Sequence, residues 1–304
     1  MADPTSSSAA SFSAAPAAAP PPAAGKAALA RNLRQRLIVG VLGGIAFVAA
    51  VLWRPESLAA LVLLLTVTGI LEFYRLVRTA GFRPERGPGV GLALITVAVL
   101  GTLALGRLPV WAPWLLPPAV ALVLVVELYR SAHPQPFVNV ALTWAGVTYV
   151  AVPLGLLPML AFSADGRFSG WPVLGLVLLI WAADTGAYAA GRLWGRRKLF
   201  PRHSPGKTWE GWAGGTLLTL ATGLALARWV PGAPLSMVQW LGAAALVAVF
   251  GVWGDLAESM LKRSLGVKDS GRLLPGHGGV LDRFDSLLLA TPFVVAWVKV
   301  WALV

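Results

Sequence analysis

The chain has 304 residues, of which 57% are hydrophobic and only 12% are charged. Because soluble domains carry about 25% charged residues, this composition excludes a soluble protein and indicates an integral membrane protein. The absence of cysteine from the sequence excludes a disulfide framework, a thiolate metal site and a cysteine nucleophile. The net charge of +12 does not predict a nucleic-acid partner, since Lys and Arg gather in the cytoplasmic loops of membrane proteins.

Residues 1–35 differ in composition from the rest of the chain. They are rich in Ala, Pro and Ser and contain the run Pro20-Pro21-Pro22, which predicts a disordered cytoplasmic tail. We expect no signal peptide here, because no basic segment precedes an apolar core. Arg31, Arg34 and Arg36 directly precede the first apolar run, and they predict a retained first span that begins in the cytoplasm.

Nine apolar runs follow, each close to the roughly 20 residues that a membrane span requires. They cover residues 37–53, 58–75, 89–106, 110–128, 138–162, 172–190, 212–229, 236–257 and 286–304. Pro153 and Pro158 predict a kink or a break in the fifth run. The sequence therefore predicts an all-α integral membrane protein with about nine transmembrane helices.

The distribution of basic residues predicts the orientation. With the N-terminus in the cytoplasm, 20 of the 25 Lys and Arg residues fall on the cytoplasmic side, and an odd number of spans places the C-terminus outside. The two long cytoplasmic loops, 191–211 and 258–285, are rich in charge and glycine. We therefore expect residues 36–304 to form one polytopic catalytic domain whose chemistry faces the cytoplasm. We find no internal repeat, which disfavours a transporter built from inverted repeats.

Three acidic residues lie within or at the ends of predicted spans, where charge is costly. Glu72 and Glu127 lie at inner ends, and we expect them to pair with Arg75 and Arg130 nearby. Asp184 lies inside the sixth run among small residues that allow a neighbouring helix to approach closely. It is either a hydrogen-bonded structural residue or part of a polar cavity that faces the site.

The segment from Ser259 to Asp285 concentrates polar side chains between two spans. Asp282 and Asp285 are three residues apart and would point the same way from a helix, and with Asp255 they offer the oxygen ligands that suit Mg²⁺. Cations and a glycine turn, which suit phosphate oxygens, are interleaved with these carboxylates: Lys262, Arg263, Lys268, Arg283, Gly278 and Gly279. His277 is either structural or a phosphate donor. This combination predicts phosphoryl or nucleotidyl transfer.

Ser204, Lys207 and Thr208, in the other cytoplasmic loop, are candidates for phosphate contacts. A Walker A motif is excluded, because Pro201 stands where that motif requires a glycine. The alternative is a positively charged loop with a helix beginning at Ser204-Pro205, which would explain the charge but not the grouping of Ser, Lys and Thr.

The segment 259–285 resembles the signature of the phosphatidate cytidylyltransferase (CDP-diacylglycerol synthase) family. The matching positions are Ser259, Lys262, Arg263, Lys268, Asp269, Gly271, Leu274, Pro275, His277, Gly278, Gly279, Asp282, Arg283 and Asp285. The blocks at 184–188, 204–211 and 254–256 are also similar to the family, and the resemblance extends from about residue 70 to the end. Gly206 departs from it, since a basic or polar residue is more usual there.

The resemblance implies that CTP and phosphatidate react to give CDP-diacylglycerol and pyrophosphate, with Mg²⁺ required and K⁺ as a further cation. It implies metal ligation by Asp255, Asp282 and Asp285, and phosphate contacts from Ser259, Lys262 and Arg263 in the reaction centre. The implied substrate-binding residues are Ser204, Lys207, Thr208, Lys268, His277, Gly278, Gly279 and Arg283. It further implies a homodimer in the cell inner membrane that acts in phospholipid biosynthesis.

Two alternatives remain open from the residues. A CTP-dependent polyprenol kinase would transfer the γ-phosphoryl group and release CDP. A transporter of an anionic metabolite would use Asp184 and Asp255 to couple ions, although the charge lies mostly in loops and not at the bilayer midplane.

Overall fold

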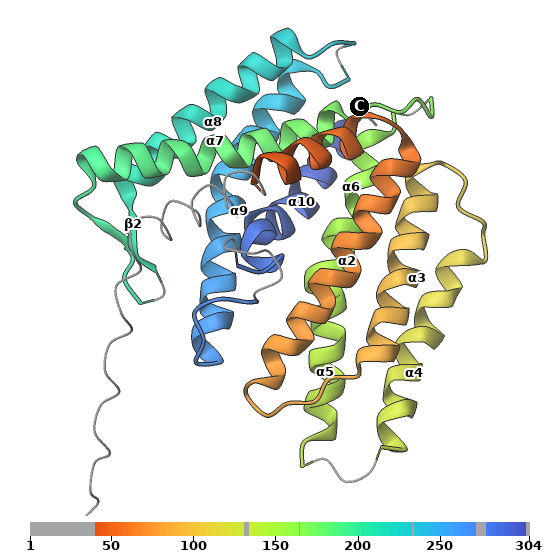
Figure 1. Ribbon diagram of the computed structural model, residues 1–304. Coiled ribbons are helices and arrows are strands. Elements are labelled where there is room, and N and C mark those ends of the chain that lie inside the picture. The colour runs from red at the N-terminus through yellow and green to blue at the C-terminus, as the bar shows by residue number, and fades with distance from the viewer. Residues whose placement is uncertain are drawn as a thin grey trace, which may run out of the picture.

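The computed structural model describes residues 40–130, 134–163, 165–202, 204–232, 234–271 and 278–301. The predicted tail at residues 1–35 and the candidate His277 lie outside these residues. Within them the chain is largely helical, and the helices fall into two groups that meet along α10, Leu281–Trp301 (Figure 1).

The first group contains the N-terminal elements, and α2, α3, α4 and the α5–α6 run lie side by side in it (Figure 1). Its elements are the helix Gly40–Leu52, α2 (Pro55–Arg78), α3 (Arg86–Ala104), the 3₁₀ turn η1 (Ala112–Leu115), α4 (Leu116–Leu128), α5 (Pro136–Gly146), the π-helical turn η2 (Val147–Ala151) and α6 (Val152–Ala161).

The second group contains α7 (Trp171–Trp194), β1 (Lys198–Phe200), β2 (Ser204–Thr208), α8 (Trp209–Trp229), α9 (Met237–Ser264) and α10. Helices α7 and α8 lie side by side and run across the molecule (Figure 1). Helix α10 packs against α9 on one side and against α6 on the other. The residues that begin α10 are therefore enclosed by both groups.

Six helical runs of the described residues are long and apolar enough to cross a membrane. They are α2, α3, the continuous run Pro136–Ala161, α7, α9 and α10. The helices Gly40–Leu52 and Ala112–Leu128 are apolar but shorter, and α8 does not meet the same criterion. Each of the nine predicted apolar runs overlaps a helix, so a helical membrane protein is supported, while nine crossings and the orientation stay predictions.

The fifth predicted run contains a π-helical turn and is not interrupted. Pro153 has no N–H to donate to the carbonyl of Tyr149, so the α-helical hydrogen-bond ladder cannot pass this point. The chain forms the wider turn η2 there and then continues as α6, which contains Pro158. The predicted break is therefore absent, and the helix changes to a π-helical turn just before Pro153.

A β-hairpin departs from the all-α prediction. Strands β1 and β2 pair antiparallel, with Lys198 opposite Thr208 and Phe200 opposite Ser204. The alternative of a helix beginning at Ser204-Pro205 is wrong, since α8 begins at Trp209. Thr208 ends the strand and caps the helix, because its hydroxyl accepts the N–H of Gly211 at 3.1 Å.

Small residues allow α7 and α8 to pack closely, as the sequence predicted around Asp184. A Cβ on Gly186 would lie 2.7 Å from the carbonyl oxygen of Gly214. A Cβ on Gly214 would lie 2.2 Å from the Cβ atom of Ala190. Larger side chains would force the two helices apart. This packing places the hairpin, which connects the two helices, at their common end.

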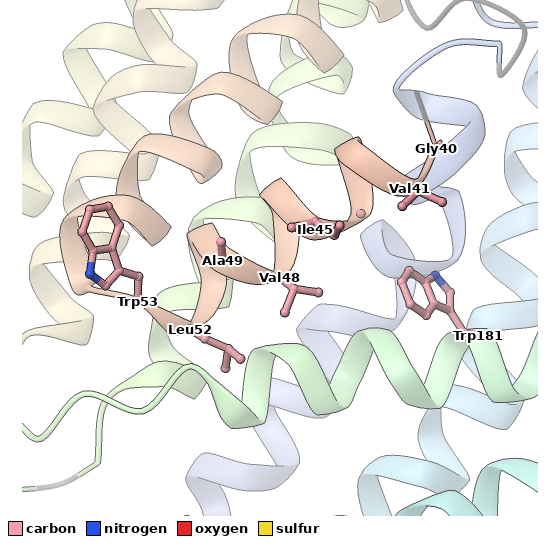
Figure 2. A pocket seen from close by; sticks show the side chains of 9 residues that line it. Gly40, Val41, Ile45, Val48, Ala49, Leu52, Trp53 and Trp181 are labelled. Carbon is pink, nitrogen blue, oxygen red and sulfur yellow. The ribbon is translucent and has the colours of Figure 1, made fainter. Parts of the chain in front are cut away.

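An apolar groove of about 630 Å³ follows the helix Gly40–Leu52 (Figure 2). Its lining residues are Gly40, Val41, Gly44, Ile45, Val48, Ala49, Leu52, Trp53 and Trp181. Trp53 lies at one end of the groove, and Trp181 of α7 lies near Val41 at the other (Figure 2). Because this lining carries no charged side chain, the groove is separate from the polar residues that form the candidate site.

Candidate active site

The C-terminal part of α9 carries polar side chains that meet the β-hairpin. Lys207 Nζ of β2 lies 2.7 Å from Asp255 Oδ2 of α9 and 3.4 Å from the carbonyl oxygen of Val252. One turn further along α9, the Ser259 hydroxyl donates to Asp255 Oδ1 at 3.3 Å. Residues of the two polar loops thus meet at Asp255.

Lys262, also on α9, lies between two carboxylates. Its Nζ is 2.6 Å from Glu258 Oε2 and 2.6 Å from Asp282 Oδ1 of α10. The Lys262 and Asp282 side chains are each 13% exposed and that of Glu258 only 1%, so these charges are poorly screened by water. The second Glu258 oxygen, Oε1, is buried without a hydrogen-bond partner among the described residues.

Asp282 also organises the chain that leads into α10. Its second oxygen, Oδ2, accepts the backbone N–H groups of Ser270 and Gly279, each at 3.0 Å. Gly278 has a φ of +81°, which favours glycine, and a Cβ there would lie 2.9 Å from Asp282 Oδ2. The glycine turn therefore allows the backbone to close around this carboxylate.

Two further carboxylates approach Asp255 from neighbouring helices. Asp184 of α7 interacts electrostatically with Lys207 and Asp255, and Asp285 of α10 interacts with Asp255 and Asp184. Helix α10 comes this close because residue 254 is glycine, where a Cβ would lie 2.5 Å from the Asp285 carbonyl oxygen. Asp184 thus interacts with Lys207 and Asp255, while its place in a polar cavity that faces the site stays a prediction.

Glu210, at the start of α8, holds the hairpin that carries Lys207. Its carboxylate accepts the backbone N–H of Arg196 at 3.0 Å and that of Arg197 at 3.1 Å. These hydrogen bonds lower the pKa of Glu210 below its ordinary value, and the bond from Arg196 has the largest effect. The first strand is therefore tied to the helix that follows the second.

Comparison with known proteins identifies the family to which these residues belong. The model of the cytidylyltransferase family matches residues 34–301, which include every element of the site. The chain belongs to this family. It is 37% identical over 278 residues to the phosphatidate cytidylyltransferase of Pseudomonas aeruginosa, covering 88% of this chain and 98% of that one. It is 31% identical over 291 residues to that of Mycobacterium bovis, covering 88% of each chain.

A third relative matches over a shorter length. The phosphatidate cytidylyltransferase of Staphylococcus aureus is 38% identical over 190 residues, covering 60% of this chain and 70% of that one. Together with the family match, these similarities make this chain a cytidylyltransferase.

The carboxylates of this cytidylyltransferase differ in their freedom to bind a metal ion. Both Asp282 oxygens already accept hydrogen bonds, from Lys262 on one side and from two backbone amides on the other. Asp285 Oδ1 accepts the N–H of Ser286, and its negative charge is repelled by those of Asp255 and Asp184. A divalent cation would relieve this repulsion, so the set around Asp255 and Asp285 fits Mg²⁺ better than Asp282 does.

No three acidic or histidine side chains of the described residues are grouped closely enough to hold a metal ion by themselves. This arrangement still suits Mg²⁺, which commonly binds through one or two protein carboxylates and completes its octahedron with water and substrate phosphates. The residues present therefore fit a metal that enters together with a nucleotide.

The other predicted site residues lie around this centre. Arg263 donates to the carbonyl oxygen of Val267 at 3.5 Å and is exposed, as are Lys268 and Arg283. Ser204 begins β2, three residues before Lys207, and the Thr208 hydroxyl is buried at the start of α8. None of these side chains contributes to the bonds around Asp255 and Asp282 that are described above.

Sequence reasoning gave Glu72 and Glu258 no role in the site. Glu127 lies 3.6 Å from Arg130, as expected, but Glu72 was wrongly expected to pair with Arg75. The Glu72 carboxylate instead accepts backbone N–H groups of α10, 208 and 209 positions away in the chain. The available signal was an acidic residue within an otherwise apolar predicted span, which is costly unless it has partners.

Proposed function

We propose that the chain is a phosphatidate cytidylyltransferase, which converts CTP and phosphatidate to CDP-diacylglycerol and pyrophosphate. The observation that carries the proposal is the junction of two polar segments at α9, where Lys207 meets Asp255 and Lys262 meets Asp282. Cations held by carboxylates beside further unpaired carboxylates suit a substrate that is both phosphate-rich and metal-bound. The relatives named phosphatidate cytidylyltransferase support phosphatidate as the acceptor and a cytidine nucleotide as the donor.

In the proposed reaction, a phosphate oxygen of phosphatidate attacks the α-phosphorus of CTP. The new P–O bond forms as the bond from the α-phosphorus to the bridging oxygen breaks, and pyrophosphate leaves with the electron pair. The lipid supplies the nucleophile, so no covalent enzyme intermediate is required. Lys207 and Lys262 neutralise phosphate charge, and Ser259 donates a hydrogen bond, with Arg263, Lys268 and Arg283 adding positive charge at the entrance.

We propose that Mg²⁺ is bound by Asp255 and Asp285, with Asp282 organising Lys262 and the turn at Gly278 and Gly279. A magnesium ion held there would supply electrostatic stabilisation of the negative charge that develops on the leaving pyrophosphate. K⁺ is retained as a second cation on the family resemblance alone. Ser204, Thr208 and His277 remain proposed phosphate contacts on the same basis.

We propose about nine membrane crossings within residues 36–304, with a cytoplasmic N-terminus and tail, an external C-terminus and placement in the cell inner membrane. The basic residues support this orientation, since most of them flank the inner ends of the predicted spans. The site would then face cytoplasmic CTP. A homodimer is proposed on the family resemblance.

The decisive experiment uses purified protein in detergent with phosphatidate, Mg²⁺ and CTP labelled separately in the cytidine and in the γ-phosphate. We expect the cytidine label in the lipid fraction and the γ-label in pyrophosphate. Transfer of only the γ-label to lipid would contradict the proposal and favour a lipid kinase. Turnover in detergent would also exclude transport as the main activity.

A further inference from the structure

Glu72 lies far from the site in sequence, but its carboxylate contacts the segment that forms the site. It belongs to α2 and is 2% exposed. Its Oε2 accepts the backbone N–H of Val280 at 2.8 Å, and its Oε1 accepts that of Leu281 at 3.1 Å and a hydrogen bond from the Ser270 hydroxyl. All three donors lie in or beside the first turn of α10.

The Glu72 carboxylate contacts the chain on both sides of residues 272–277. Ser270 and Gly271 lie before that segment, and Gly279 lies after it. A Cβ on Gly271 would lie 3.0 Å from Glu72 Cδ, and a Cβ on Gly279 would lie only 1.8 Å from Glu72 Oε1. Neither glycine has a positive φ, so both are required by the closeness of the carboxylate and not by the backbone conformation.

Glu72 and Asp282 together satisfy the amides at the start of α10. Three successive N–H groups end on carboxylate oxygens, that of Gly279 on Asp282 and those of Val280 and Leu281 on Glu72. The N-terminal amides of a helix have no partner within the helix, and negative charge is favourable at that end. Ser270 links the two carboxylates, donating its N–H to Asp282 and its hydroxyl to Glu72.

We propose that Glu72 is a positioning residue, which fixes the first turn of α10 so that Asp282 holds Lys262 in place for the reaction. This inference rests on the proposed function, since it concerns the geometry of that site. Glu72 acts through Asp282, whose Oδ1 lies 2.6 Å from Lys262 Nζ. A buried carboxylate from the N-terminal group of helices thereby sets the geometry of a site built by the C-terminal group.

The first test compares Glu72→Gln with Glu127→Gln, a matched loss of a buried carboxylate from the same group of helices. Glutamine keeps the shape but replaces one acceptor oxygen with a donor that faces backbone N–H groups. We expect kcat to fall about 10²-fold in Glu72→Gln, as a misplacement of about 1 Å can produce, with the KM for CTP changed by less than about threefold. The Glu127→Gln protein should keep kcat within about threefold.

A second test uses the close contact between Glu72 and Gly279. Gly279→Ala alone should reduce kcat about as much as Glu72→Gln, because the new methyl group occupies the place of the carboxylate. In a Glu72→Ala background the same Gly279→Ala substitution should reduce kcat by a smaller factor, because the carboxylate is gone and the Ser270 hydroxyl, 2.2 Å from the added Cβ, has lost its acceptor and can rotate away. Independent, multiplicative losses in the double variant would overturn the proposed contact.

A third measurement does not depend on activity. Hydrogen–deuterium exchange of the peptide that contains Val280 and Leu281 should be faster in Glu72→Gln than in the wild type, and unchanged in Glu127→Gln. A wild-type protein that forms no CDP-diacylglycerol would contradict the proposed function, while exchange would still report the contact. Unchanged exchange, or equal losses of kcat and melting temperature in Glu72→Gln and Glu127→Gln, would overturn the positioning role.

Discussion

Among the described residues, two polar clusters differ in how far their carboxylates outnumber their cations. The α3–α5 cluster consists of Glu85, Glu127, Arg130, Asn139 and Thr143. The α9–α10 cluster consists of Asp184, Lys207, Asp255, Glu258, Lys262, Asp282 and Asp285. The first has two carboxylates and one cation, while the second has five carboxylates and two cations.

The α3–α5 cluster satisfies its members mostly within itself. Arg130 pairs with both Glu85 and Glu127, and Asn139 donates to Glu127 at 3.0 Å. The backbone N–H of Glu85 donates to the Thr143 hydroxyl at 2.8 Å. Such a cluster fixes the ends of neighbouring helices, and it leaves one carboxylate in excess of its single cation.

The α9–α10 cluster retains an excess of negative charge that its own cations do not neutralise. Its carboxylates outnumber its cations by three, against one in the α3–α5 cluster, and the larger excess favours the binding of further cations. Substitutions that change this excess test the difference between the two clusters.

The largest effect is expected from Asp282→Asn. The amide carries no charge to attract Lys262, and it has only one oxygen where the carboxylate uses two. The side chain therefore cannot hold both Lys262 and the two backbone N–H groups of the turn. We expect turnover to fall by about 10³-fold or more in the transfer of cytidine label to lipid. Glu127→Gln is the control from the other cluster, and near-normal turnover of Asp282→Asn would contradict the role assigned to Asp282.

A smaller but still large effect is expected from Lys262→Met. This substitution leaves the Glu258 and Asp282 carboxylates facing each other without their shared cation, which should destabilise the fold by about 3 kcal/mol and reduce kcat by about 10²-fold. The double variant Lys262→Met/Glu258→Gln should regain part of the melting temperature but not kcat. Recovery of both would show that Lys262 serves stability alone.

Part of the α9–α10 cluster was predictable from sequence, because its members lie on one helix. The spacing of Asp255, Ser259 and Lys262 places them on one face of a helix, and the structure has them there. Arg263 follows Ser259 by four residues, yet it donates to the Val267 carbonyl and is exposed. Helical spacing thus indicates which face of the helix a side chain lies on, but not which partner it contacts.

The contacts between distant segments could not be predicted in this way. The spacing of residues along the chain does not predict the contact of Glu72 with Val280, because the packing of α2 near α10 brings the two residues together. The hairpin was also missed, because three- and five-residue strands with Pro205 and Gly206 show no alternation of apolar and polar residues. The all-α membrane architecture followed from composition, while these tertiary contacts required the structure.

A moderate effect is expected from Lys207→Met, which removes the cation nearest Asp255. A hydrogen bond to a charged group is worth about 1.5–3 kcal/mol, so the KM for CTP should rise about tenfold or more. Lys198→Met is a matched control, since Lys198 lies on the other strand of the hairpin and is exposed. Equal effects of both substitutions would mean that Lys207 contributes only general positive charge. Lys207 would then have no specific role in the α9–α10 cluster.

The smallest effect is expected in the α3–α5 cluster, as a change in the pH dependence of stability. Burial, followed by the hydrogen bond and charge of Glu127, raises the pKa of Glu85 above its ordinary value, while Arg130 acts in the opposite direction. The folded protein therefore holds a proton at Glu85 that the unfolded chain releases as pH rises above about 4.3. The resulting stabilisation is present below that pH and is lost as pH rises through the folded-state pKa.

Glu85→Gln should remove this pH dependence, because glutamine does not titrate. Measured as melting temperature from about pH 4 to 7, the variant should lose less stability than the wild type as pH rises, so that the difference between them grows in favour of the variant. Turnover at neutral pH should change little, since Glu85 bonds to Arg130 and Thr143 of the α3–α5 cluster. A difference in melting temperature that is constant with pH would contradict the proton held at Glu85. A large loss of turnover would show that the α3–α5 cluster serves the reaction as well as the fold.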